Sequence, residues 1–150
     1  VNDMNKCFSE IHRVSKENVL IALPTCLNAC VFARIGGANY YDFNYKSIPC
    51  MFIGMGKVLE AWIAGKEGVY ENNEEKGEII KHYQRFPWKI IQICEENNFT
   101  VIKYGADGFC FPWLKIFVYF QKFFDKGAYF PGMRNFGFGT HFLLKKKSFN

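Results

Sequence analysis

Two cysteines four residues apart, Cys26 and Cys30 in "TCLNACVFARI", are the side chains of this chain best suited to chemistry. We predict a helix from Cys26 to about Ile35, with Thr25 as its N-cap and Gly36 at its end. Residues i and i+4 share one helix face, so both sulfurs could meet one metal ion. A structural zinc site needs four ligands, usually as two close pairs. The other cysteines and the three histidines are scattered, so we expect no metal site and no cofactor.

Cys26 is also a candidate nucleophile, because unpaired N–H groups and the helix dipole in a first helical turn lower a thiol pKa. His141, in a predicted strand, could act as its base, and Cys30 would be the second choice of nucleophile. "TCLNAC" is similar to the start of the nucleophile helix of papain-like enzymes, which implies such a Cys–His pair. That family pattern is incomplete here, since no acidic residue follows His141; the third residue would have to lie upstream, such as Asp107 or Asp125. The alternative, which we favour, is that both thiols pack in the core.

The segment 134–142, "RNFGFGTHF", resembles the aromatic octamer of RNA-recognition motifs. In that fold a helix and a strand follow the octamer, and the eight remaining residues cannot form both, so we exclude the fold. Arg134, Phe136 and Phe138, together with the lysine-rich end, could still stack on a single nucleic-acid strand. The alternative is a glycine-rich turn whose Phe side chains pack inside.

The composition favours recognition of another protein. The chain has 17 Phe, 8 Tyr and 3 Trp among 150 residues and a net charge of +5, and residues 98–150 hold 8 basic and 2 acidic groups. So many rings exceed the usual needs of a small core, and exposed aromatic and Arg side chains carry interface energy. The side chains that we predict to bind a partner are Tyr40, Tyr41, Phe43, Tyr45, Tyr129, Phe130, Arg134, Phe136 and Phe138.

Hydrophobic periodicity and turn residues predict the elements. Residues 53–58, "IGMGKV", lack the first glycine and the Ser or Thr of a phosphate-binding loop, so we interpret them as a turn before a helix. Pro87 should kink a helix over 78–97. The predicted helices are 2–14, 26–35, 57–64, 78–97 and 112–125; the predicted strands are 18–23, 99–104 and 140–144, with a short strand near 51–54, a polar mobile loop at 65–77 and a turn at 105–108.

These elements predict an α+β fold: one globular domain over 1–150, with four to five helices packed on a small mixed sheet. No apolar run reaches the roughly 18 residues needed to cross a bilayer, and we see no leader peptide. Free thiols in apolar surroundings favour a cytoplasmic location. We expect a non-catalytic protein that binds another protein, of the inhibitor, immunity or antitoxin type. The alternatives are a Cys26–His141 hydrolase or acyl transferase and a single-stranded nucleic-acid binder; the oligomeric state stays open.

Overall fold

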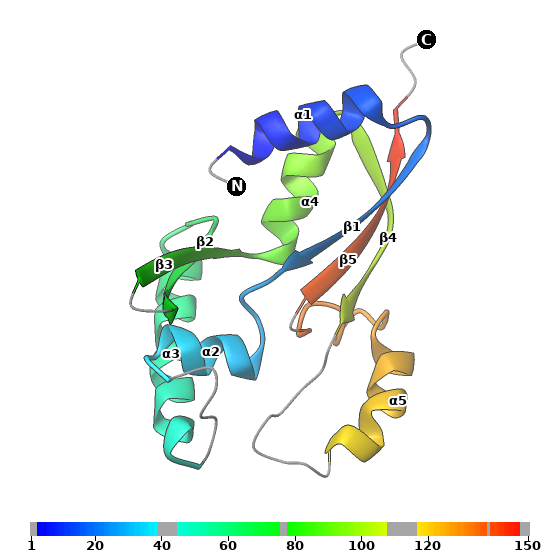
Figure 1. The fold of residues 1–150 in the computed structure, drawn as a ribbon. Helices are drawn as coiled ribbons and strands as arrows, with labels where there is room; N and C mark the ends of the chain where they lie inside the picture. Colours follow the sequence, from blue (N-terminus) through cyan, green and yellow to red (C-terminus); the bar gives the residue numbers. More distant parts are fainter. Residues whose placement is uncertain (1–2, 39–44, 76–77, 108–116, 138, 148–150) are drawn as a thin grey trace.

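The computed structural model describes residues 3–38, 45–75, 78–107, 117–137 and 139–147. Within these ranges the chain forms five α-helices and two antiparallel sheets, which confirms the predicted α+β class (Figure 1). In the described part of the chain the strands form two separate antiparallel sheets rather than the single mixed sheet that we predicted, and the one parallel pairing there is an isolated bridge between Thr25 and Arg85. The elements are α1 (Met4–Val14), β1 (Asn18–Pro24), α2 (Ala29–Ile35), the 3-10 helix η2 (Tyr45–Ser47), α3 (Ile48–Ile63), β2 (Gly68–Glu75), β3 (Glu78–Arg85), α4 (Pro87–Glu96), β4 (Phe99–Asp107), α5 (Phe117–Gly127) and β5 (Gly139–Lys146).

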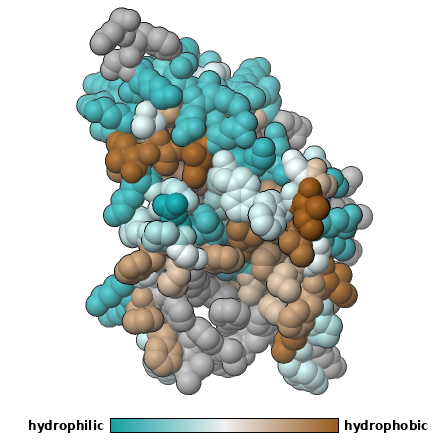
Figure 2. Space-filling view, turned by 180° about the vertical axis from the view of Figure 1, so that it is seen from behind, coloured by the Kyte–Doolittle hydropathy of each residue, from teal (hydrophilic) through white to brown (hydrophobic). Residues whose placement is uncertain are grey.

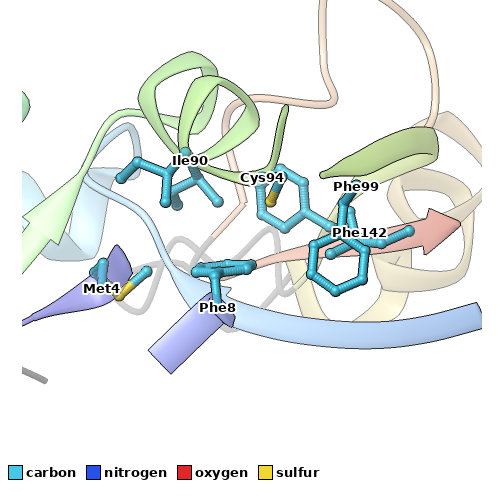
Figure 3. Close-up of a cluster of buried hydrophobic side chains, with 8 residues drawn as sticks. Met4, Phe8, Ile90, Cys94, Phe99 and Phe142 are labelled. Atoms are coloured by element: carbon cyan, nitrogen blue, oxygen red, sulfur yellow. The ribbon is translucent and has the colours of Figure 1, made fainter. Parts of the chain in front are cut away.

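The first sheet has the order β1-β5-β4 and forms the main core with α1 and α4. Along the central strand β5, the alternate residues Thr140, Phe142 and Leu144 are buried, as expected for a sheet covered on one face. Phe142 and Leu144 join Phe8 of α1 and Ile90 of α4 in this cluster (Figure 3). The sheet and the two helices thus make one layered unit.

The second unit packs the β2-β3 hairpin with α2 and α3, on the other side of the molecule in Figure 1. Helices α2 and α3 approach closely because glycines stand at their crossing. A Cβ atom on Gly54 would lie 1.7 Å from the Phe32 carbonyl oxygen, and one on Gly36 would lie 1.8 Å from the Cys50 carbonyl oxygen. Only glycine fits at such a backbone-to-backbone contact.

Several predicted elements match the structure. The helix predicted at 2–14 is present as α1, and the carboxylate of its cap, Asp3, accepts a 2.9 Å hydrogen bond from the Lys6 N–H. The strands predicted at 18–23, 99–104 and 140–144 are present in β1, β4 and β5. The turn predicted at 105–108 is wrong for residues 105–107, which continue β4. Of the helix predicted at 112–125, residues 112–116 lie outside the described residues and the rest belongs to α5, on which Tyr119, Phe120 and Phe123 are exposed.

Five other predictions are wrong. Residues 78–85 form β3 rather than a helix, and 68–75 form β2 rather than a loop. Helix α3 begins at Ile48, so it includes both the strand predicted near 51–54 and the turn predicted at 53–58. Helix α2 begins at Ala29 with Asn28 as its cap, three residues later than expected.

None of the helices in the described part of the chain has both the length and the apolar character that a membrane span requires.

A buried ion pair explains why the hairpin escaped prediction. Glu71 of β2 is fully buried, and its carboxylate contacts the Arg34 guanidinium of α2 and accepts a 3.2 Å hydrogen bond from Gln84 of β3. Polar residues therefore occupy inward positions of both strands, where the alternating pattern of a half-buried strand would require apolar ones. Burial raises the pKa of Glu71, and the Arg34 charge partly offsets that rise.

Candidate functional site

The most unusual surface feature is an apolar stripe along α3. Ile48, Phe52, Met55, Leu59 and Trp62 follow one another at spacings of four, three, four and three, and they are 41%, 57%, 45%, 48% and 57% exposed. This alternation of three and four places all five on one helix face, as at the a and d positions of a coiled coil. We call these five residues the α3 stripe.

A groove runs beside the α3 stripe and shares Met55, Leu59 and Trp62 with it. Its volume is about 370 Å³. The Trp62 and Trp88 rings lie 6.2 Å apart, and Trp88 stacks on Phe86 at 4.7 Å. We call this space the apolar groove; its lining is Leu27, Phe32, Met55, Val58, Leu59, Trp62, Phe86, Trp88, Asn135 and Phe136.

Asn28 fixes the position of Phe136, one of the residues that line the groove. Its side-chain oxygen accepts a 2.8 Å hydrogen bond from the Cys30 N–H and so caps α2, while its amide nitrogen donates to the Phe136 carbonyl at 3.3 Å. Beside Phe136, the Thr25 hydroxyl lies within hydrogen-bonding distance of the Gly137 carbonyl oxygen, at 3.4 Å. The start of α2 thereby holds Phe136 against the groove.

The stripe and the groove offer apolar contact rather than acid–base chemistry. Among the described residues, the groove lining contains no titratable side chain, and Asn135 is its one polar residue. In Figure 2 the top of the molecule is mainly hydrophilic. Hydrophobic residues form one patch in the upper left and also lie over the lower part, where Figure 1 places α2, α3 and α5. With about 200 Å² per large apolar side chain, the exposed fractions of the α3 stripe, Ile63, Trp88 and Phe136 correspond to roughly 800 Å². That area exceeds the largest apolar patch of about 300–600 Å² on a typical monomer.

The structure gives no support to a reactive Cys26. This residue precedes the Asn28 cap, so it does not occupy the first turn of α2. It is fully buried among Val31, Val58 and Phe86, and burial raises its pKa to about 12. A thiol that keeps its proton at neutral pH is a poor nucleophile. Cys30 is buried as well.

His141 lies on β5 as predicted, and its Nε2 atom is 3.6 Å from an Asp107 carboxylate oxygen. His141 and Asp107, one of the two residues considered for the third position, therefore lie close together at the sheet. Among the described residues, no hydrogen bond joins His141 to Cys26, which belongs to the cluster around α2 and α3. In the same part of the chain, no group of three or more His, Cys, Asp or Glu side chains could hold a metal ion.

The predicted binding residues that the structure describes lie in more than one place on the surface. Tyr45, Tyr129 and Phe130 are exposed, and Phe136 borders the apolar groove. Arg134 instead stacks on the Tyr104 ring at 4.3 Å, in a separate pocket that also contains Lys103 and Tyr129. This separation weakens the idea that Arg134 and Phe136 clamp one nucleic-acid strand together. The predicted residues Tyr40, Tyr41, Phe43 and Phe138 lie outside the described residues.

Comparisons with protein-family models, curated proteins and solved structures found no match. The function of this chain therefore has to be inferred from its own surface. Sequence reasoning missed the α3 stripe because the helix was expected to begin only at Lys57. The signal was nevertheless present, since the spacing of the five apolar residues is visible in the sequence once Pro49 is placed in a first helical turn.

Proposed function

We propose that this chain is a non-catalytic protein-binding protein that receives an apolar helix of another protein chain on α3. The single observation that supports the proposal most strongly is the exposure of all five residues of the α3 stripe. Helices that display apolar residues at a and d spacing normally bury them against another helix.

The partner surface should be a helix with apolar side chains at i, i+3, i+4 and i+7, because such a helix presents a matching row of knobs. The apolar groove would take the larger side chains of that helix, between Trp62, Trp88 and Phe136. Aromatic residues that line a recess are typical centres of binding energy.

A designed helix of about three heptads, with Leu at a and d and balanced Glu and Lys elsewhere, tests the proposal. Fluorescence anisotropy of the labelled helix measures its affinity for the wild-type protein. Leu59→Glu places a charge inside the α3 stripe, whereas Leu20→Glu places the same charge on an exposed Leu of β1. We expect Leu59→Glu to weaken binding at least about tenfold, because a charge left unpaired in an apolar contact is costly, and Leu20→Glu to leave it unchanged.

Circular dichroism must show that both variants keep the fold, and exposed positions should change stability by no more than about 0.5 kcal/mol. Equal binding of the designed helix to both variants would refute the proposal. So would failure of the wild-type protein to bind it.

A further inference from the structure

We infer that the helix received by the α3 stripe is α3 of a second copy of this chain, so that the protein forms a two-fold dimer. This inference rests on the proposed function, and it names the partner of the same surface. Cyclic two-fold dimers are the commonest oligomers, and they need a patch that is complementary to itself.

The residues beside the stripe meet that need. In a helix pair the flanking e and g positions face the partner and often carry charges that select it. In α3 these flanking positions hold no charged side chain. Two copies of α3 would therefore meet without like-charge repulsion at these positions, and no pattern of charges there would select a foreign helix. The flanking residues are Pro49, Met51, Gly56 and Ile63, together with Val58, which is buried in the core.

The charged residues of α3 point away from the stripe. The helix has two of them, Lys57 and Glu60. Lys57 extends its ammonium group to the Ile35 carbonyl oxygen at 3.1 Å, on the side of α2. On a helical wheel Glu60 lies about 100° from Leu59 and outside the stripe. Neither charge would therefore be buried when two stripes meet.

The area also fits a dimer. The roughly 800 Å² of exposed apolar surface around the stripe and the groove is the most that these residues can bury, and it is comparable to the roughly 800 Å² that each partner contributes to an interface of standard size. A smaller patch would leave the dimer weak.

The apolar character of the patch predicts further that salt should not weaken the dimer, since screening reduces the repulsion between two chains that each carry +5.

Sedimentation velocity from about 1 to 200 µM tests the inference on the full chain. We expect the wild-type protein and Leu20→Glu to shift from monomer to dimer, at a midpoint that added salt does not raise. Leu59→Glu should stay monomeric, or dimerise only at a concentration at least about tenfold higher. An excess of the designed helix should convert the wild-type dimer to a complex of one chain with one helix.

Two results would overturn the dimer. One is a wild-type protein that stays monomeric over the whole range; the other is a dimer that Leu59→Glu leaves intact, which would place the contact elsewhere. These results do not decide the proposed function by themselves. If the monomer still binds the designed helix through Leu59, the surface binds a foreign helix and only the self-association is wrong; if it binds neither, both statements fail.

Discussion

Removal of the Arg34 charge should lower the free energy of unfolding, because the buried Glu71 would lose its ion-pair partner. Glu71 is fully buried, and its carboxylate contacts the Arg34 guanidinium and the Gln84 amide. Arg34→Met preserves much of the side-chain length but leaves a buried carboxylate without its cation. Breaking a buried ion pair in this way costs about 3–5 kcal/mol, a large part of the roughly 5–15 kcal/mol that stabilises an ordinary domain.

The loss should depend on pH in a defined direction. Burial already raises the pKa of Glu71, and Arg34 opposes that rise, so the variant's folded-state pKa should be higher still. A carboxyl that binds its proton more tightly in the folded state stabilises the protein at low pH, and that stability is lost as pH rises through the raised pKa. The gap in the free energy of unfolding between wild type and Arg34→Met should therefore be large at pH 7 and much smaller near pH 4, where the carboxyl of Glu71 is mostly protonated.

Urea denaturation at the two pH values, followed by circular dichroism, measures the gap. The double variant Arg34→Met/Glu71→Leu is the matched control, because replacement of both partners by apolar residues is often neutral. It should recover most of the lost stability at pH 7 and remove the pH dependence of the gap. A gap of equal size at pH 4 and pH 7, or a double variant no more stable than Arg34→Met, would refute the reasoning.

The remaining predictions concern glycine packing and buried thiols. Gly54→Ala should destabilise the protein by about 2–3 kcal/mol through overpacking against α2. Gly56→Ala in the same helix, with nothing within 4 Å of the added Cβ, should stabilise it by about 0.5–1 kcal/mol. Equal urea midpoints for the two variants would contradict the close α2–α3 contact. Iodoacetamide at pH 8 should label the half-buried Cys50 before Cys26, as read by peptide mass spectrometry, and early labelling of Cys26 would restore it as a nucleophile. Burial raises the pKa values of Cys26 and Cys94 from 9.0 to about 12, so the unfolded state ionises first above pH 9, and stability should fall with rising pH by about 1 kcal/mol per pH unit for each thiol. Replacement of both cysteines by Ala should flatten that slope, and an unchanged slope would assign it to other groups.

The elements that sequence reasoning predicted well are those whose apolar pattern matches their burial. Strand β5 alternates clearly, with Phe142 and Leu144 turned to the core, and α1 combines an apolar stripe with an Asp3 cap. In both cases the local signal and the tertiary contacts agree, which is the condition under which sequence patterns are informative.

The failures arise where a tertiary contact replaces the local signal. Glu71 and Gln84 can occupy inward positions of the hairpin because Arg34 of α2 pairs with Glu71. Arg34 lies about forty residues before the hairpin in the sequence, so no local sequence window contains this contact. Gly54 suggests a turn when considered alone, yet it belongs to a helix because the Phe32 carbonyl lies against it. Neither contact could be inferred before the α2–α3 arrangement was known.

The candidate site was only partly predictable. Exposed aromatic residues were expected from the composition, and Phe136 is one of them. The stripe itself depends on which face of α3 packs against α2 and which remains open, and that choice follows from Gly54, Val58 and Ala61 on the buried face. Spacing predicts that a helix face is apolar, but packing decides whether that face is exposed.

Hydroxyl-radical footprinting tests the central claim most directly, since it reports the accessibility of single side chains on the α3 stripe. The protein is compared alone at low concentration, at high concentration, and with an excess of the designed helix. We predict that oxidation of Met55 and Trp62 falls when the protein is concentrated or when the designed helix is added, while oxidation of the exposed Tyr119 on α5 stays constant. Unchanged oxidation of Met55 and Trp62 under both conditions would contradict the claim that this face of α3 binds a helix.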